Sequence, residues 1–173
     1  MSRGTHRTSR RATAIRGFGR RSVTTGRRIA PLLVLGLVLS AGCAIPRWPV
    51  DDAPMTSAFG VRFRGILPEV HRGVDLGVPS GTTVRAMSGG RVAFAGRQGA
   101  YGNAVWIDHG GRVWTLYAHL SRVDVVTGRD VGPGQVIGLS GATGDVSGPH
   151  LHFEVWRWGR PVDPVPLLGR PPR

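Results

Sequence analysis

The sequence contains a single cysteine, Cys43, among its 173 residues, so no internal disulfide can form. A metal site built from several thiolates is excluded for the same reason. From Thr82 onward, no stretch has apolar residues that recur at helical spacing, and the apolar run at 29–39 is shorter than the ~20 residues that a membrane-spanning helix needs. These absences argue against a disulfide scaffold, a zinc-thiolate fold and a helical domain.

Acidic residues are missing from the first 28 positions, whereas nine of the 23 basic residues lie there. The formal net charge of +13 therefore comes mostly from the N-terminal segment. The remaining 14 basic and ten acidic residues leave about +4, which is ordinary for a globular domain. We therefore expect no nucleic-acid partner. The length allows one domain and a tail.

The Arg-rich segment is followed by an apolar run, Ile29 to Leu39, and then by the small residues of Ser40-Ala41-Gly42-Cys43. This order is typical of an export signal. Ala41-Gly42-Cys43 also resembles a bacterial lipobox, although the usual leucine three residues before the cysteine is Ser40 here. Lipidation of Cys43, plain cleavage and an uncleaved anchor remain open, as do general secretory and twin-arginine export. We expect the protein to be exported to the cell envelope or outside the cell, with a lipid anchor as one alternative.

After residue 43 the sequence predicts a short tether at 44–54, one domain at 55–166 and a C-terminal tail at 167–173. Within the domain, short β-type runs alternate with glycines, which favours an all-β antiparallel curled sheet or sandwich. The expected strands cover 55–60, 83–87, 91–95, 103–108, 112–119, 123–126 and 136–140, and residues 149–154 form another. Trp106, Trp114, Trp156 and Trp158 are expected to pack in the core, and His109 is interpreted as a turn residue.

Five residues remain as candidates for chemistry: His71, Asp75, His119, His150 and His152. In the alternating run Pro149 to Glu154, the imidazoles of His150 and His152 share one strand face, roughly 7 Å apart. A catalytic zinc needs three protein ligands and an open position for water. His71, Asp75 and one histidine of the later pair would supply these ligands.

Seven short motifs occur in the order found in the lysostaphin-type (LytM-like) zinc endopeptidases, which cut bacterial cell-wall peptides. They are TSAFGVR (56–62), HRGVD (71–75), YGN (101–103), IDHG (107–110), YAHL (117–120), GATG (141–144) and PHLHFE (149–154). The sequence resembles this family from about Thr56 to Pro164. The resemblance implies a duplicated-hybrid-motif-like β-fold with a loop-walled groove that holds one Zn²⁺.

The same resemblance assigns His71, Asp75 and His152 to the metal and makes His119 and His150 the catalytic imidazoles. Glu154 continues the face of His150 and His152, so it could hold a ligand ring or pair with an arginine; an ordinary surface carboxylate is the other interpretation. One departure lies before His71, where some family members have a tyrosine that helps the oxyanion. Only Phe63 occurs there, and phenylalanine cannot donate a hydrogen bond.

The expected function is zinc-dependent hydrolysis of peptide cross-links or stem peptides of peptidoglycan by a monomeric domain. The resemblance favours direct cross-links with D-amino acids or diaminopimelate over glycine bridges. The alternative is a non-catalytic module of the same fold that binds the cell wall or activates an amidase. Such relatives usually lose metal or catalytic residues, whereas all five positions are filled here.

Overall fold

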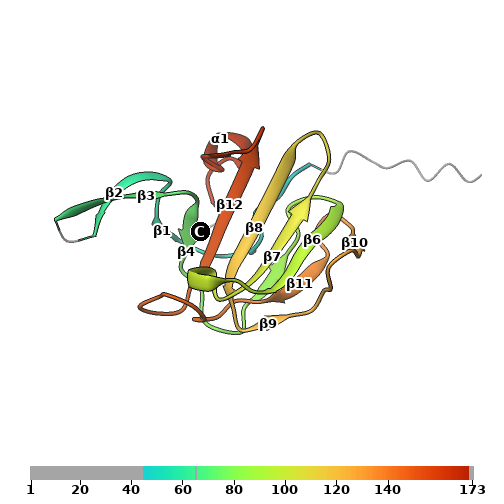
Figure 1. The fold of residues 1–173 in the computed structure, drawn as a ribbon, viewed down its shortest axis with the longest axis horizontal. Coiled ribbons are helices and arrows are strands. Elements are labelled where there is room, and N and C mark those ends of the chain that lie inside the picture. Colours follow the sequence, from blue (N-terminus) through green and yellow to red (C-terminus); the bar gives the residue numbers. More distant parts are fainter. Residues whose placement is uncertain (1–44, 65, 172–173) are drawn as a thin grey trace, which may run out of the picture. The chain divides into compact units, whose positions relative to one another are not determined.

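The computed structural model describes residues 45–64 and 66–171, and the predicted export segment at 1–43 lies outside them. The described residues form three antiparallel sheets, with one short α-helix and one 3-10 turn (Figure 1). The prediction of an all-β antiparallel fold is therefore confirmed. Within the described ranges, no helix is long and apolar enough to cross a membrane.

The largest sheet has eight strands and carries most of the candidate site. Seven of them lie in the order β1, β4, β12, β8, β7, β6, β10, and β13 pairs with β12. Their bounds are β1 Met55–Ser57, β4 Val74–Leu76, β6 Gly90–Arg97, β7 Asn103–Asp108, β8 Val113–Leu120, β10 Asp130–Val131, β12 Leu151–Arg157 and β13 Arg160–Val162. The 3-10 turn η1 (Gly99–Tyr101) joins β6 to β7.

Two smaller sheets complete the fold. One consists of β5 (Thr83–Arg85), β11 (Val136–Leu139) and β9 (Arg122–Val123), paired in the order β5, β11, β9. The other is a hairpin of β2 (Gly60–Arg64) and β3 (Leu67–His71) that projects away from the large sheet (Figure 1). Helix α1 (Val165–Leu168) follows β13. The β2–β3 hairpin was not predicted, because its Gly/Pro-containing sequence has the composition of a loop.

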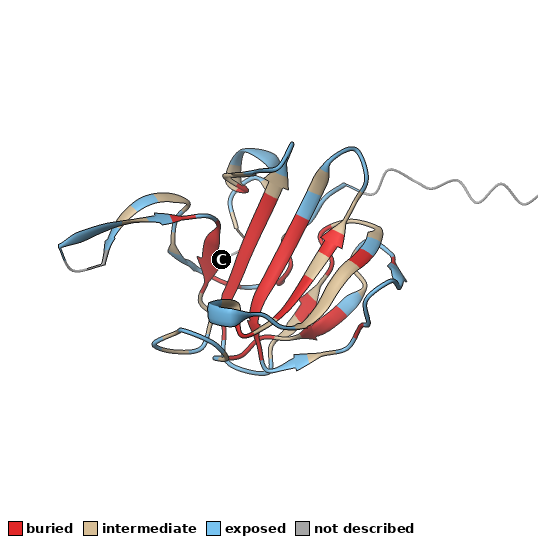
Figure 2. Cartoon of the chain, viewed as in Figure 1, coloured by how far each residue is buried: buried red, intermediate tan, exposed pale blue. Residues whose placement is uncertain are grey.

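The hydrophobic core lies on one face of the large sheet. Alternate residues of β12, namely Leu151, Phe153 and Val155, are fully buried, whereas the other set carries His152, Glu154 and Trp156 on the opposite face. Burial is densest along β12 and β8 (Figure 2). The rigid central strands therefore support the residues of the other face.

Two of our expectations about packing were wrong. Val50 and Ala53, from the segment expected to be a tether, are buried in the core, and the backbone N–H of Arg85 donates to the Pro49 carbonyl. The four tryptophans expected in the core lie on the other face of the sheet, where Trp106 packs against a small second buried cluster but Trp114 is 37% and Trp158 is 66% exposed. Strand alternation explains this, because Trp106 is out of phase with the buried Val105 and Ile107.

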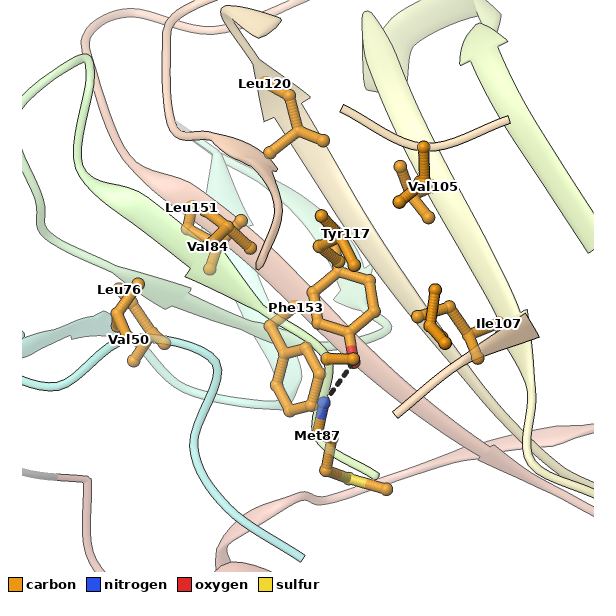
Figure 3. Packing of buried hydrophobic residues seen from close by; sticks show 14 of the residues in the cluster. Val50, Leu76, Val84, Met87, Val105, Ile107, Tyr117, Leu120, Leu151 and Phe153 are labelled. Atoms are coloured by element: carbon orange, nitrogen blue, oxygen red, sulfur yellow. Dashed lines mark hydrogen bonds between the residues drawn. The ribbon is translucent and has the colours of Figure 1, made fainter. Parts of the chain in front are cut away.

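Tyr117 connects the large sheet to the loop after β5. Its ring packs 5.4 Å from that of Phe153, and its hydroxyl accepts a hydrogen bond from the Met87 backbone N–H at 2.8 Å (Figure 3). The hydroxyl also accepts one from Thr115 Oγ1 at 3.0 Å. Burial raises the pKa of Tyr117 to about 12, so the hydroxyl stays neutral. The core is thus held by a polar contact as well as by apolar packing.

We expect Tyr117→Phe to lower the free energy of unfolding by about 1–3 kcal/mol, because the buried Met87 N–H loses its acceptor. Urea denaturation followed by circular dichroism measures the change. A matched variant, Phe153→Leu, removes ring packing without affecting this N–H. An unfolding midpoint unchanged by Tyr117→Phe would show that the hydroxyl contributes nothing to stability.

Candidate metal centre and active site

Three side chains from three strands converge at one end of the large sheet. His71 ends β3, Asp75 lies in β4, and His152 lies in β12 directly opposite Asp75 in the strand register. His71 Nε2 and His152 Nδ1 are 3.1 Å apart, and they lie 3.1 and 2.8 Å from Asp75 Oδ1. Gly73 permits this approach, since a Cβ there would overlap the Phe153 carbonyl oxygen. The geometry of a three-ligand metal site is therefore present.

In His71 and His152, the hydrogen bond of the ring nitrogen that points away from the centre shows which nitrogen faces it. His71 Nδ1 lies 2.7 Å from the Ala58 carbonyl oxygen, and His152 Nε2 lies 2.9 Å from Glu154 Oε1. Both partners are acceptors, so these nitrogens carry the protons and the opposite nitrogens present lone pairs. With both rings neutral, two lone pairs and a carboxylate oxygen thus converge, and only a ring that takes up a second proton donates to Asp75 Oδ1. Such an arrangement is stabilised by a positive charge at its centre, either that proton or a metal ion, so the ligand set fits a metal ion.

Glu154 is 0% exposed and is not the surface carboxylate that one interpretation of the sequence allowed. It accepts hydrogen bonds from the His152 ring, from the Tyr101 hydroxyl (2.7 Å) and from the Trp156 indole N–H. Burial opposes its charge, but these hydrogen bonds lower the pKa of Glu154. Burial likewise opposes a charge on His152, yet its bonds to Asp75 and Glu154 raise its pKa. Glu154 thus orients the His152 ring and adds negative charge behind it.

Arg62 holds the second oxygen of Asp75. Its guanidinium donates to Asp75 Oδ2 at 3.1 Å and lies 3.5 Å from Glu69 Oε2, the register partner of Arg62 across the β2–β3 hairpin. Burial alone would raise the pKa of Asp75, but hydrogen bonds from His152 and His71 hold it well below its usual range. Asp75 is therefore ionised and leaves Oδ1 directed at the centre. The β2–β3 hairpin thus positions Arg62 beside Asp75.

His119 reaches the site because the backbone of β8 departs from regular alternation at its end. Thr115 and Tyr117 face the core, and regular alternation would direct His119 to the same side; its φ of 63° lies in the left-handed region and breaks the pattern. The His119 ring lies 4.8 Å from that of His150 and 5.8 Å from that of His152. The strained backbone thus supplies the site with a further imidazole.

A loop carbonyl orients the His119 ring. His119 Nδ1 donates to the Thr143 carbonyl oxygen at 2.8 Å, which leaves Nε2 as the lone-pair nitrogen. Gly102, with φ 65°, lets the chain after η1 approach this loop, since a Cβ there would overlap the Thr143 backbone. Burial, together with the neighbouring His150 and His152, lowers the pKa of His119 to about 4. The ring is therefore neutral and able to accept a proton at neutral pH.

His150 lies at the mouth of the same site. Its Nδ1 donates to the Gly148 carbonyl oxygen at 3.0 Å, and its Nε2 lies 3.7 Å from Asp75 Oδ1. These residues line an open groove of about 560 Å³, and Phe63, 72% exposed, lies along its wall. The structure thus gathers all five predicted site residues around one groove.

Several contacts in the site could not be foreseen. Sequence reasoning did not anticipate Arg62, the hydroxyl of Tyr101 or the carbonyl groups of Ala58 and Thr143 as partners of the site residues. The positions of Arg62 and Tyr101 within shared motifs were the available signal, but the motifs do not say what these side chains touch. His109 lies in the turn after β7, where its ring bonds to the Gly89 carbonyl and to Thr115 Oγ1, consistent with its interpretation as a structural residue.

Comparisons with known proteins identify the family to which the chain belongs. Residues 69–164 match the sequence model of peptidase family M23. The chain is 49% identical over 119 residues to the DD-carboxypeptidase/endopeptidase Mpg of Neisseria meningitidis, an alignment that covers 68% of this chain and 27% of Mpg. It is 33% identical over 170 residues to the murein hydrolase activator EnvC of Escherichia coli, covering 95% of this chain and 40% of EnvC. The chain thus spans well under half the length of these relatives.

Solved structures give the same result. A zinc-containing peptidase from Vibrio cholerae superposes with a TM-score of 0.67 at 37% identity, over 75% of this chain and 41% of that chain. The catalytic domain of lysostaphin from Staphylococcus simulans superposes with a TM-score of 0.63 at 35% identity, over 68% of this chain and 93% of the domain. The resemblance to lysostaphin-type peptidases is confirmed, and the chain belongs to peptidase family M23.

Proposed function

We propose that this protein is a zinc-dependent endopeptidase that hydrolyses peptide bonds of bacterial peptidoglycan. The observation that carries the proposal is the convergence of three metal-ligand atoms, from His71, Asp75 and His152, beside two further imidazoles in an open groove. These three ligand atoms all lie within 4.8 Å of one another. The similarity to Mpg and to a zinc-containing peptidase supports both the metal and the substrate.

The ligand set of two imidazoles and one carboxylate suits zinc and leaves coordination positions open. His71 Nε2, His152 Nδ1 and Asp75 Oδ1 would hold the ion, with Arg62 and Glu154 fixing the ligands from behind. Two imidazoles with one carboxylate also occur in non-haem iron sites, so zinc is preferred here on the similarity to a zinc-containing peptidase. When bound, zinc supplies Lewis acidity toward a peptide carbonyl and lowers the pKa of water.

The two remaining imidazoles provide proton transfer. His119 and His150 each bond to a backbone carbonyl through Nδ1, so each neutral ring presents a lone pair at Nε2. Either Nε2 can take a proton from the attacking water and return it to the leaving amine. His119 is the more buried of the two, and the Thr143 carbonyl orients its ring. These roles need no carboxylate base.

The alternative function is that of a non-catalytic activator. The similarity to EnvC, which is named as a murein hydrolase activator and aligns with 95% of this chain, favours it. The filled ligand positions favour the enzyme. We propose export to the cell envelope for either function, on the basis of the N-terminal segment, with anchoring through Cys43 as one arrangement.

Digestion of purified cell walls tests the proposal. Walls with direct cross-links and walls with glycine bridges are incubated with the zinc-loaded protein, with and without chelator, and the released peptides are identified by mass spectrometry. We expect chelator-sensitive release from directly cross-linked walls. If the zinc-loaded protein cuts no wall but stimulates an added amidase, the alternative function as a non-catalytic activator is correct.

A further inference from the structure

A hollow of about 750 Å³ lies on the same sheet face as the candidate site, lined mainly by aromatic side chains. We name it the tryptophan hollow and define it by Phe94, Trp106, Arg112, Trp114, Trp156 and Trp158. Its residues come from β6, β7, β8 and the turns at one end of the large sheet, together with β12. No large aliphatic side chain lines it. Flat ring faces therefore form most of its surface.

The hollow lies on the same face of β12 as the candidate metal centre, further along the strand. His152, Glu154 and Trp156 occupy alternate positions on one face, and the Glu154 carboxylate bonds to both the His152 ring and the Trp156 indole. Trp114 is the direct register partner of Trp156 on β8. At about 3.3 Å per residue, Trp156 lies roughly 13 Å along β12 from His152. The groove at the candidate site and the hollow are thus separate openings on one sheet face, four strand residues apart.

The aromatic rings are held with their faces available. The Trp106 indole N–H is bonded to Gln98 Oε1 and that of Trp156 to Glu154, and the two rings pack edge to face with centroids 5.8 Å apart. The polar atoms of these two rings are thus satisfied within the protein. What they present outward is apolar ring surface.

Trp158 is exposed in a conformation that bulky residues seldom adopt. Its φ is 57° and its side chain is 66% exposed, in the turn between β12 and β13. The Arg112 guanidinium lies 5.0 Å from the centre of its ring, and the Trp158 backbone N–H donates to the Arg112 carbonyl at 3.0 Å. Glycine or asparagine would occupy this position at lower cost. The left-handed conformation belongs to the two-residue hairpin turn Trp158–Gly159, and it leaves the indole exposed beside Arg112.

We propose that the tryptophan hollow binds the glycan strand of peptidoglycan, with sugar rings stacked on the indoles of Trp114 and Trp158. Pyranose rings have apolar C–H faces that pack flat against indoles, and the guanidinium of Arg112 offers donors to hydroxyl and acetamido oxygens. Stem peptides are attached to the glycan, and four extended residues span about 13–14 Å, which matches the distance from His152 to the hollow. A flat lipid surface fits a concave hollow poorly. This inference rests on the proposed peptidoglycan substrate.

Binding is tested on the full chain after chelation of metal, so that hydrolysis plays no part. The probe is a chito-oligosaccharide of N-acetylglucosamine, titrated while tryptophan fluorescence and calorimetry are recorded. We expect saturable binding that weakens about tenfold in Trp158→Ala and is largely retained in Trp158→Tyr, which keeps an aromatic face. Val126→Ala, at an exposed apolar residue outside the hollow, is the matched control and should bind like the unchanged protein.

A second measurement separates this inference from the proposed function. The zinc-loaded protein is given intact walls and, separately, a cross-linked peptide without glycan. We expect Trp158→Ala to raise the half-saturating wall concentration about tenfold without a comparable change for the free peptide. Sugar binding without any hydrolysis would sink the proposed peptidase and keep the subsite. No sugar binding, with binding to anionic vesicles or dimer formation through the hollow instead, would overturn the subsite.

Discussion

Replacement of Asp75 by alanine should release the metal and abolish peptide hydrolysis. Asp75 Oδ1 lies within 3.1 Å of both imidazole donor atoms, so its loss removes one of three ligands and the negative charge that offsets a divalent cation. It also removes the carboxylate that balances the Arg62 guanidinium beside the centre, although Arg62 keeps its contacts with Ser57 and Glu69. Metal affinity should fall on the order of 100-fold or more, since losing even an outer partner costs 10–100-fold. Metal content after dialysis and the rate of wall hydrolysis measure the two effects.

The matched variant is His119→Ala. His119 is held by the Thr143 carbonyl, and its ring centre lies 5.8 Å from that of His152, so it belongs to the groove and not to the ligand cluster. We expect this variant to keep stoichiometric metal while hydrolysis falls by about 10²–10⁴-fold, the usual contribution of a general base. Loss of metal from His119→Ala as readily as from Asp75→Ala would show that ligand and catalytic roles are assigned wrongly.

Replacement of Glu154 by alanine should have the next largest effect, on both folding and metal binding. The buried carboxylate is the acceptor for three donors, from His152, Tyr101 and Trp156. Its removal leaves these donors unpaired and should cost about 3 kcal/mol or more of the free energy of unfolding. The His152 ring also loses the partner that fixes its tautomer, so metal affinity should drop about 10–100-fold. Denaturant unfolding of the metal-free protein and competition with a chromogenic chelator measure the two quantities separately.

Glu154→Gln provides the control for shape. It keeps the side-chain volume and one acceptor oxygen but loses the charge, so it should fold more stably than Glu154→Ala and still bind metal more weakly than the unchanged protein. A merely structural role predicts that metal affinity is restored along with stability. Affinity that stays reduced in a well-folded Glu154→Gln supports a role of the carboxylate in tuning His152.

The prediction of the fold succeeded where local pattern and burial agree. The run 103–108 was predicted with the same limits as β7, because its alternation is regular and its turns are marked by glycine. Elements with few buried apolar residues, or with only two or three residues, were missed. Strands β2 and β3 form a hairpin whose apolar residues are largely exposed, and β10 and β13 have only two and three residues, too few for a periodic signal.

The tryptophans illustrate a different limit. Residue type alone favours burial for indole, yet Trp106, Trp114 and Trp156 lie on the face opposite the core. Alternation within β7 already placed Trp106 out of phase with Val105 and Ile107. That pattern was a better guide than residue type, because a strand can direct only one of its two faces toward the core.

The sequence by itself determined which residue types were available for chemistry: one cysteine, a His-x-His strand, and a histidine and an aspartate four positions apart. Motif order was sufficient to indicate the family. Only the tertiary structure decided how these residues act, because pairing between β4 and β12 joins Asp75 to His152 across 77 positions. The same pairing buries Glu154 behind the site. At the end of β8, the left-handed backbone conformation of His119 turns its ring toward the site. Contacts between strands distant in sequence depend on register and backbone twist, which no local pattern specifies.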